Sequence, residues 1–196
     1  MKTGIILLAA GASSRLGRPK QLLKIEGKTL IQRAIDEAQK SIAEELVVVL
    51  GWNPELIQEG FRGKNIAVVI NKNWEQGMAS SMQAGLQFFE KGKPVDQVIL
   101  MLCDQPYVSS SLLDQLMEEK EKSWKGIVAC SYSNTIGVPA LFDQRYFQEM
   151  LQLKGSEGAK KVILKHPEDV FSIEFPEGSV DLDTEEDLKQ MKNWIE

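Results

Sequence analysis

The chain of 196 residues predicts an α/β fold in which helices cover both faces of a mainly parallel sheet, giving three α/β/α layers. Short apolar runs, which suit strands buried on both faces, recur along the chain. Between them lie segments whose apolar residues recur at helical spacing. No segment resembles a linker, so we expect one domain over residues 1–196.

The first half of the chain predicts the order β, α, β, α, β. The apolar run from Gly4 to Ala10 is the first strand, and Leu46 to Leu50 and Ile66 to Ile70 are the next two. Thr29 can cap the first helix, and Gln32 stands where it would complete a capping box. A short helix between the second and third strands completes this alternation.

The second half continues the pattern less regularly. Apolar residues from Met78 to Phe89 have helical spacing, and Val98 to Cys103 is the strongest strand in the chain. A helix from Leu112 to Lys122 and a strand from Gly126 to Ser131 follow. The stretch from Asn134 to Phe142 contains a proline, which predicts an edge strand or a substrate loop.

Composition excludes several classes of function. Lys and Arg total 23 against 28 Asp and Glu, a net charge of −5, so general attraction to nucleic acid is not expected. The N-terminal apolar run is too short to cross a bilayer and lacks a signal-peptide cleavage pattern, which predicts a cytoplasmic protein without a membrane partner. Cys103 and Cys130 stand far apart in apolar stretches, so we expect buried, reduced thiols.

The segment from residue 10 to residue 20, here called the opening loop, has the residue types of a phosphate site. Its small residues allow a ligand to lie against backbone N–H donors, and its cations add positive charge. These residues are Gly11, Ala12, Ser13, Ser14 and Gly17, with Arg15, Arg18 and Lys20. Their spacing fits neither the Walker pattern nor GxGxxG. The alternative is an ordinary glycine-rich turn with solvated cations.

Two other places predict contacts with a ligand. Ser80 and Ser81 stand near the start of a predicted helix, where N–H groups suit an anion or the polar edge of a base, although a Ser-capped core helix would look the same. Asp104 ends the strongest strand, and ligands gather at such strand ends. Because Mg²⁺ binds carboxylates together with phosphate oxygens, Asp104 predicts a magnesium ligand rather than a turn residue. Asp181 and Asp183 alternate before a predicted C-terminal helix and could share this cation.

Four stretches together resemble the nucleotidyltransferase superfamily in its MobA-like branch. They are Leu8-Ala9-Ala10-Gly11-Ala12-Ser13-Ser14-Arg15-Leu16-Gly17 followed by Lys20, Gly77-Met78-Ala79-Ser80-Ser81-Met82-Gln83-Ala84-Gly85-Leu86, Leu102-Cys103-Asp104-Gln105-Pro106-Tyr107-Val108 and Asp181-Leu182-Asp183-Thr184. The resemblance implies a Rossmann-like sheet of the nucleotidyltransferase type.

The resemblance also implies roles for individual residues. Arg15, Lys20 and Asp104 would be catalytic, and Asp104 and Asp183 would hold Mg²⁺. The nucleotide-binding set would be Leu8, Ala9, Ala10, Gly11, Ser13, Ser14, Arg15, Lys20, Gly77, Ser80 and Ser81. The substrate-facing set would be Gln105, Pro106, Gly137 and Pro139. The chain departs from the family pattern at Ser156 and Lys160, where Asp and Arg are usual.

The reaction that the resemblance implies is transfer of CMP from CTP to the molybdenum–molybdopterin cofactor, with release of pyrophosphate. Such a transfer depends on positioning and charge neutralisation more than on a protein nucleophile. A recipient molybdoenzyme or its chaperone would be a further partner. A guanylyltransferase for the same cofactor and a sugar-phosphate or polyol-phosphate nucleotidyltransferase are alternatives. A non-catalytic carrier of a nucleotide cofactor is an alternative of another class.

Overall fold

The computed structural model describes residues 1–13 and 16–180, so the predicted site residues Ser14, Arg15 and Asp183 lie outside the described part, as does Asp181. The strands are β1 (Thr3–Ala9), β2 (Lys24–Ile25), β3 (Lys28–Thr29), β4 (Glu45–Leu50), β5 (Ala67–Ile70), β6 (Gln97–Leu102), β7 (Ile127–Tyr132), β8 (Thr135–Asp143) and β9 (Val170–Glu174). The α-helices are α1 (Leu30–Lys40), α2 (Pro54–Glu59), α3 (Met78–Gly92), α4 (Ser110–Ser123), α5 (Phe147–Met150) and α6 (Lys160–Lys165). The 3₁₀ turns are η1 (Lys20–Leu22), η2 (Trp74–Gln76), η3 (Gln144–Tyr146), η4 (Pro167–Asp169) and η5 (Pro176–Ser179).

Seven of these strands form one sheet in the order β5-β4-β1-β6-β8-β7-β9. Strand β1 pairs in parallel with both β4 and β6, and β4 pairs in parallel with β5. Strand β8 runs antiparallel to both of its neighbours, β6 and β7, and β9 pairs in parallel with β7. The carboxyl ends of β1 and β6 therefore meet at the same edge of the sheet, as the sequence predicts.

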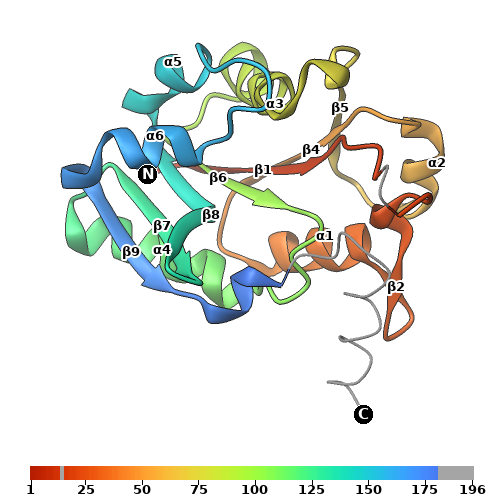
Figure 1. Ribbon diagram of the computed structural model, residues 1–196, viewed down its shortest axis with the longest axis horizontal. Coiled ribbons are helices and arrows are strands. Elements are labelled where there is room, and N and C mark those ends of the chain that lie inside the picture. The colour runs from red at the N-terminus through yellow and green to blue at the C-terminus, as the bar shows by residue number, and fades with distance from the viewer. Residues whose placement is uncertain (14–15, 181–196) are drawn as a thin grey trace.

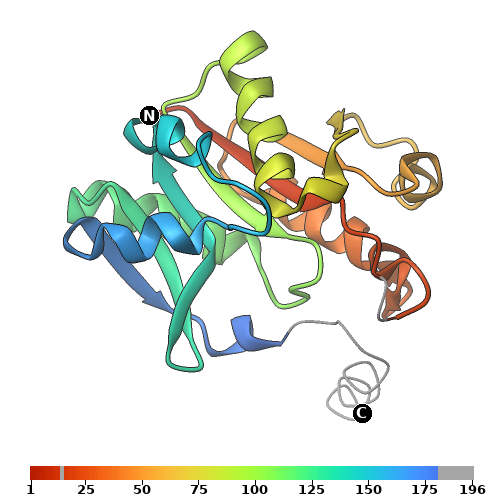
Figure 2. The same ribbon diagram turned by 45° about the horizontal axis from the view of Figure 1, so that its top comes forward.

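Helices cover both faces of the sheet, which confirms the three-layer α/β/α prediction (Figure 1, Figure 2). Strand β1 shows why, since its alternate residues point to opposite faces. Ile5 and Leu7 pack with α1 and α4, while Ile6 and Leu8 pack with α3, α5 and α6. The apolar residues of the helices on each side thus pack against one face of β1, which is apolar on both faces.

The cap predicted for α1 is present. Gln32 N donates to Thr29 Oγ1 at 3.2 Å, and Thr29 N donates to Gln32 Oε1 at 2.9 Å. The reciprocal pair gives acceptors to two backbone N–H groups at the helix start and fixes where the helix begins. The helix start is therefore encoded within four consecutive residues.

The prediction of an edge strand or loop over residues 134–142 is wrong, because β8 lies inside the sheet between β6 and β7. Pro139 is tolerated there since the pairing with β6 ends at Ala140, and the pairing with β7 shifts register between Ala129 and Cys130. Pro139 therefore stands in a bulge, where neither neighbour needs the N–H that proline lacks.

Within the part of the chain that the structure describes, none of the helices is long and apolar enough to cross a membrane.

Candidate active site

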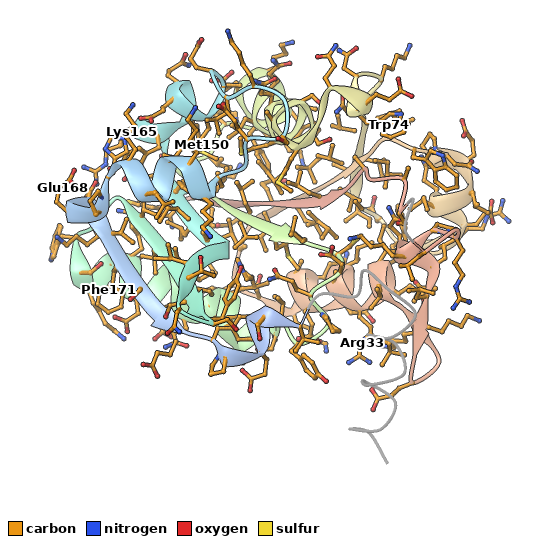
Figure 3. All side chains as sticks on the ribbon, viewed as in Figure 1. Arg33, Trp74, Met150, Lys165, Glu168 and Phe171 are labelled. Carbon is orange, nitrogen blue, oxygen red and sulfur yellow. The ribbon has the colours of Figure 1, made fainter. Side chains whose placement is uncertain are left out.

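A cavity of about 350 Å³ opens at the carboxyl ends of β1 and β6. Its walls come from the end of β1 and the opening loop, from η1, from the segment joining β5 to α3, and from the end of β6. The lining residues are Leu8, Ala9, Ala10, Gly11, Lys20, Gln21, Trp74, Glu75, Gly77, Met78, Ser81, Leu102, Cys103 and Asp104. Figure 3 labels Trp74 on the segment between β5 and α3. Eight of the predicted site residues meet in this cavity although they come from three distant segments.

Lys20 and Asp104 form an ion pair inside the cavity, through Lys20 Nζ and Asp104 Oδ2. The two residues are 84 positions apart in the chain, and both side chains are largely shielded from solvent. The pair therefore places one cation and one carboxylate at the same wall. Charges in such a low-dielectric position act more strongly on a ligand than charges on an open surface.

Asp104 fits a divalent cation by its own geometry. The residue is 8% exposed, and its buried Oδ1 atom accepts no hydrogen bond from any described residue. Buried carboxylate oxygens are normally hydrogen-bonded, paired or bound to a metal, so the unsatisfied oxygen is suited to an incoming cation. The described residues contain no cluster of three or more His, Cys, Asp or Glu that could hold a metal alone. Further ligands would have to come from phosphate oxygens, water or residues outside the described part.

Ser80 and Ser81, at the start of α3, differ in their contacts with the cavity. Ser80 does not line the cavity, and its hydroxyl donates within the segment before α3, with Gly77 O at 2.8 Å and Asn73 O at 2.9 Å from Oγ. Ser81 lines the cavity, and its Oγ accepts from Asn71 Nδ2 at 3.0 Å. The bond from Asn71 fixes the position of the Ser81 hydroxyl oxygen and uses one of its two lone pairs, so the hydroxyl can still donate to or accept from a ligand.

Gly77 is needed at its position for two reasons. Its φ of +102° lies in the region that favours glycine. A Cβ built on it would stand 2.3 Å from the carbonyl oxygen of Gly155. The loop at residues 154–158 thus packs directly on the start of α3, and Ala79 N donates to Gly155 O at 3.2 Å. The departure at Ser156 from the family pattern falls in this loop.

The predicted substrate-facing residues lie outside this cavity. Gln105 Nε2 donates to Val138 O at 3.2 Å and to Gly178 O at 3.1 Å, so its amide ties the end of β6 to β8 and η5. Gln105 and Pro106 line a second cavity of about 470 Å³ beside α1. Gly137 and Pro139 are buried in β8 and line neither cavity. A Cβ on Gly137 would stand 2.6 Å from the Tyr132 hydroxyl, which gives this glycine a packing role.

The cysteines are buried and free, as predicted. Burial, and after it the negative charge of Asp104, raises the pKa of the Cys103 thiol to about 12. The reactive form of cysteine is the thiolate, so a thiol with this pKa remains protonated near neutral pH. Cys103 therefore forms part of the cavity wall rather than a nucleophile.

Besides the apolar lining residues Met78, Leu102 and Cys103, sequence reasoning missed four residues of the site: Gln21, Asn71, Trp74 and Glu75. Gln21 and Asn71 are 1% and 6% exposed, and both use their amides on groups that shape the cavity. Their polarity offered a weak signal, because polar residues beside motif residues are common on any surface. Burial, which only the fold reveals, makes them stand out.

A protein-family model described as "MobA-like NTP transferase domain" matches residues 5–170. The match begins in β1 and ends at the start of β9, and so contains every cavity-lining residue. The resemblance to this family is confirmed, and the match covers the first three of the four stretches but ends before Asp181-Leu182-Asp183-Thr184.

Two curated relatives match over part of their length. The chain is 34% identical over 113 residues to nicotine blue oxidoreductase of Paenarthrobacter nicotinovorans, covering 57% of this chain and 54% of that protein. It is 24% identical over 148 residues to the bifunctional protein GlmU of Francisella tularensis subsp. novicida, covering 74% of this chain and 31% of that protein. The chain thus spans about half or less of the length of these relatives.

Solved structures agree over nearly the whole chain. Rv0371c from Mycobacterium tuberculosis H37Rv has a TM-score of 0.84 and 27% identity, with 97% of each chain covered. A structure of that protein in complex with manganese has a TM-score of 0.79 at 24% identity, covering 97% of this chain and 98% of that chain. Molybdopterin-guanine dinucleotide biosynthesis protein A from Archaeoglobus fulgidus has a TM-score of 0.70 at 17% identity, with 98% of each chain covered. The last two likenesses establish the shared fold.

Proposed function

Since the chain belongs to the family of MobA-like NTP transferase domains, we propose that it transfers CMP from CTP to a molybdopterin-type cofactor and releases pyrophosphate. The observation that carries this proposal is the juxtaposition of the opening loop, Lys20 and Asp104 around one cavity. The loop alone supports nucleotide binding. Asp104, with its unsatisfied buried oxygen, could hold a divalent cation beside the loop. This supports group transfer, because that chemistry needs the negative charge of the phosphates to be neutralised.

In the proposed reaction an oxygen of the acceptor phosphate attacks the α-phosphorus of CTP. A new P–O bond forms as the bond between the α-phosphorus and the bridging oxygen breaks, and that electron pair leaves with pyrophosphate. Lys20 would leave its pairing with Asp104 and neutralise the departing charge, and Arg15, outside the described residues, would assist it. The backbone N–H groups of the opening loop would orient the phosphates.

Asp104 is the residue that would hold Mg²⁺, with Asp183 proposed as the second ligand and lying outside the described residues. When bound, such an ion would supply positive charge that stabilises the negative charge of the phosphates. Manganese in the solved structure of Rv0371c supports use of a divalent metal by a similar protein. Calorimetric titration with Mg²⁺ and Mn²⁺, in the presence of CTP, tests the assignment, and equal binding by wild type and Asp104→Ala would show that it is wrong.

Trp74, Gly77 and Ser81 line the cavity beside α3, and this supports the proposal that the base and ribose would bind there. The choice of CTP depends on the run Ala9-Ala10-Gly11 together with Cys103-Asp104-Gln105-Pro106, which is nearer the cytidylyl branch than the guanylyl branch. The proposed roles of Gly137 and Pro139 toward the acceptor depend on the resemblance alone.

Pyrophosphate release, measured with each of ATP, CTP, GTP and UTP and with or without molybdenum cofactor, tests the proposal. We expect release only with CTP and the cofactor together. Faster release with GTP would favour a guanylyltransferase, and robust turnover of a sugar phosphate or polyol phosphate would overturn the proposed acceptor. Tight nucleotide binding without release of pyrophosphate under any of these conditions would favour the non-catalytic carrier.

A further inference from the structure

We propose that Gln21 is a positioning residue that turns the backbone of the opening loop toward a triphosphate. This inference depends on the proposed function, since it assigns the mechanism by which the same loop would hold its nucleotide. Gln21 belongs to η1, directly after Lys20, and is 1% exposed. Nothing in its residue type marks it as part of a phosphate site.

The Gln21 amide donates hydrogen bonds to two backbone carbonyls near the opening loop. Its Nε2 donates to Ala9 O at 3.0 Å and to Gly11 O at 2.8 Å. The carbonyl between them is held as well, because Trp52 N donates to Ala10 O at 3.0 Å. Three successive carbonyls, at the end of β1 and the start of the opening loop, therefore accept hydrogen bonds from the protein, and Gln21 supplies two of these three contacts.

Holding a carbonyl also fixes the direction of the next N–H. In a planar trans peptide, the C=O of one residue and the N–H of the following residue point in opposite directions. The contacts of Gln21 thus orient the N–H groups of Ala10 and Ala12, and the contact of Trp52 orients that of Gly11. Neither Gly11 N nor Ala12 N has an acceptor among the described residues. Backbone N–H groups without acceptors in the protein are available to donate to an anion.

Gln21 is also connected to the position of Lys20. Lys20 N donates to Ser13 Oγ at 3.0 Å, which ties η1 to the middle of the loop, and the Ser13 hydroxyl lies 3.5 Å from Gln21 Oε1. Lys20 in turn pairs with Asp104. One buried amide thus sets both the N–H groups and the start of the turn that carries the cation.

The chain offers a matched control in Gln97, which is 3% exposed and lies at the other end of the sheet. Its Nε2 donates to Thr3 Oγ1 at 2.8 Å, and it lines neither cavity. Gln21→Met and Gln97→Met each replace a buried amide side chain with the unbranched, apolar side chain of methionine, which has a similar size. Both variants are expected to be less stable than the wild type, but only Gln21→Met should bind phosphates more weakly.

The experiment is calorimetric titration of the full-length wild type, Gln21→Met and Gln97→Met with CTP, pyrophosphate and cytidine, with thermal unfolding of each variant. For Gln21→Met we expect about tenfold weaker binding of CTP and pyrophosphate, with cytidine binding unchanged, because the nucleoside end does not involve this amide. Gln97→Met should bind all three ligands as the wild type does.

Unchanged affinity of folded Gln21→Met for CTP and pyrophosphate would overturn the inference while leaving the proposed function in place. Equal loss for cytidine and pyrophosphate would also overturn it, since a general structural role would weaken both. If Gln21→Met does not fold, the uncharged Gln21→Leu takes its place, and failure of both to fold would make Gln21 a residue of the fold alone. A wild type that binds no triphosphate would overturn the proposed function and this inference together.

Discussion

Two part-buried Lys–Asp pairs invite comparison, because they join the same residue types in different surroundings. Lys20 and Asp104 lie in the cavity at the carboxyl edge of the sheet. Lys120 on α4 and Asp143 at the end of β8 are 3.3 Å apart between Nζ and Oδ2, away from that cavity. The question is which of the two pairs contributes to stability and which is available for a ligand.

The second oxygen of each carboxylate gives the answer. Asp143 Oδ1 accepts from Arg145 N at 3.1 Å, so both of its oxygens are used within the chain. Asp104 Oδ1 has no partner among the described residues. A carboxylate satisfied on both oxygens holds its elements together, whereas a buried one left half-satisfied costs stability that a ligand can restore. The difference lies in the surroundings, not in the residue types.

The largest expected effect is that of Asp104→Asn on turnover. The substitution keeps the size of the side chain but removes the charge proposed to hold the metal. We expect nucleotide-dependent pyrophosphate release to fall by about a thousandfold. Circular dichroism and thermal unfolding serve as the folding control, and near-normal turnover of a folded variant would refute the proposed role.

Lys20→Met should give the next largest effect. Methionine preserves the apolar stem but removes the cation proposed to neutralise the leaving pyrophosphate. We expect kcat/KM for the triphosphate to fall by about a hundredfold. The matched control is Lys120→Met, which removes the other lysine and should leave kcat/KM unchanged. A similar loss of kcat/KM in Lys20→Met and Lys120→Met would show that the two ion pairs do not differ in their effect on activity.

Lys120→Met should instead reduce stability. The substitution leaves Asp143 with the more distant cation of Arg145, whose Nε lies 3.8 Å from Asp143 Oδ1, so the free energy of unfolding should decrease by about 1 kcal/mol. Urea unfolding of this variant, of Asp143→Asn and of the double variant measures the coupling between the two residues. Additive losses in the double variant would show that the pair contributes no coupling energy.

A smaller, pH-dependent effect should come from Asp169, a third carboxylate held by the fold. Burial acts to raise its pKa, but the hydrogen bonds from Tyr146 Oη and Gly126 N and the charge of Arg145 outweigh it, so the pKa lies below the ordinary 3.8. The stability that Asp169 contributes is therefore full above about pH 4 and is lost as the pH falls through the lowered pKa.

Urea unfolding of the wild type and of Asp169→Asn, from about pH 6 down to about pH 2, measures this contribution. The two free energies of unfolding should differ most at the upper end of the range and converge at the acid end. A difference that stays constant with pH would show that ionisation of Asp169 does not contribute.

Local sequence predicted the elements well where a few consecutive residues decide them. Thr29 and Gln32 encode the start of α1, and the alternation of Ile5, Ile6, Leu7 and Leu8 requires helices on both faces. The place of β8 was predicted wrongly, because the bulge that admits Pro139 depends on the register of its partner strand. The register depends on how the two strands pair, so the sequence of either strand alone does not determine it.

The sequence by itself determined the α/β layers, the small-residue character of the opening loop and the presence of Asp104 at a strand end. Only the tertiary structure decided that Lys20 meets Asp104, that Asp104 Oδ1 is left without a partner in the described chain, and that Gln21 holds the loop. The physical reason is range. Periodicity and caps act over a few residues, whereas burial and the pairing of polar groups depend on which distant segments the sheet brings to the same edge.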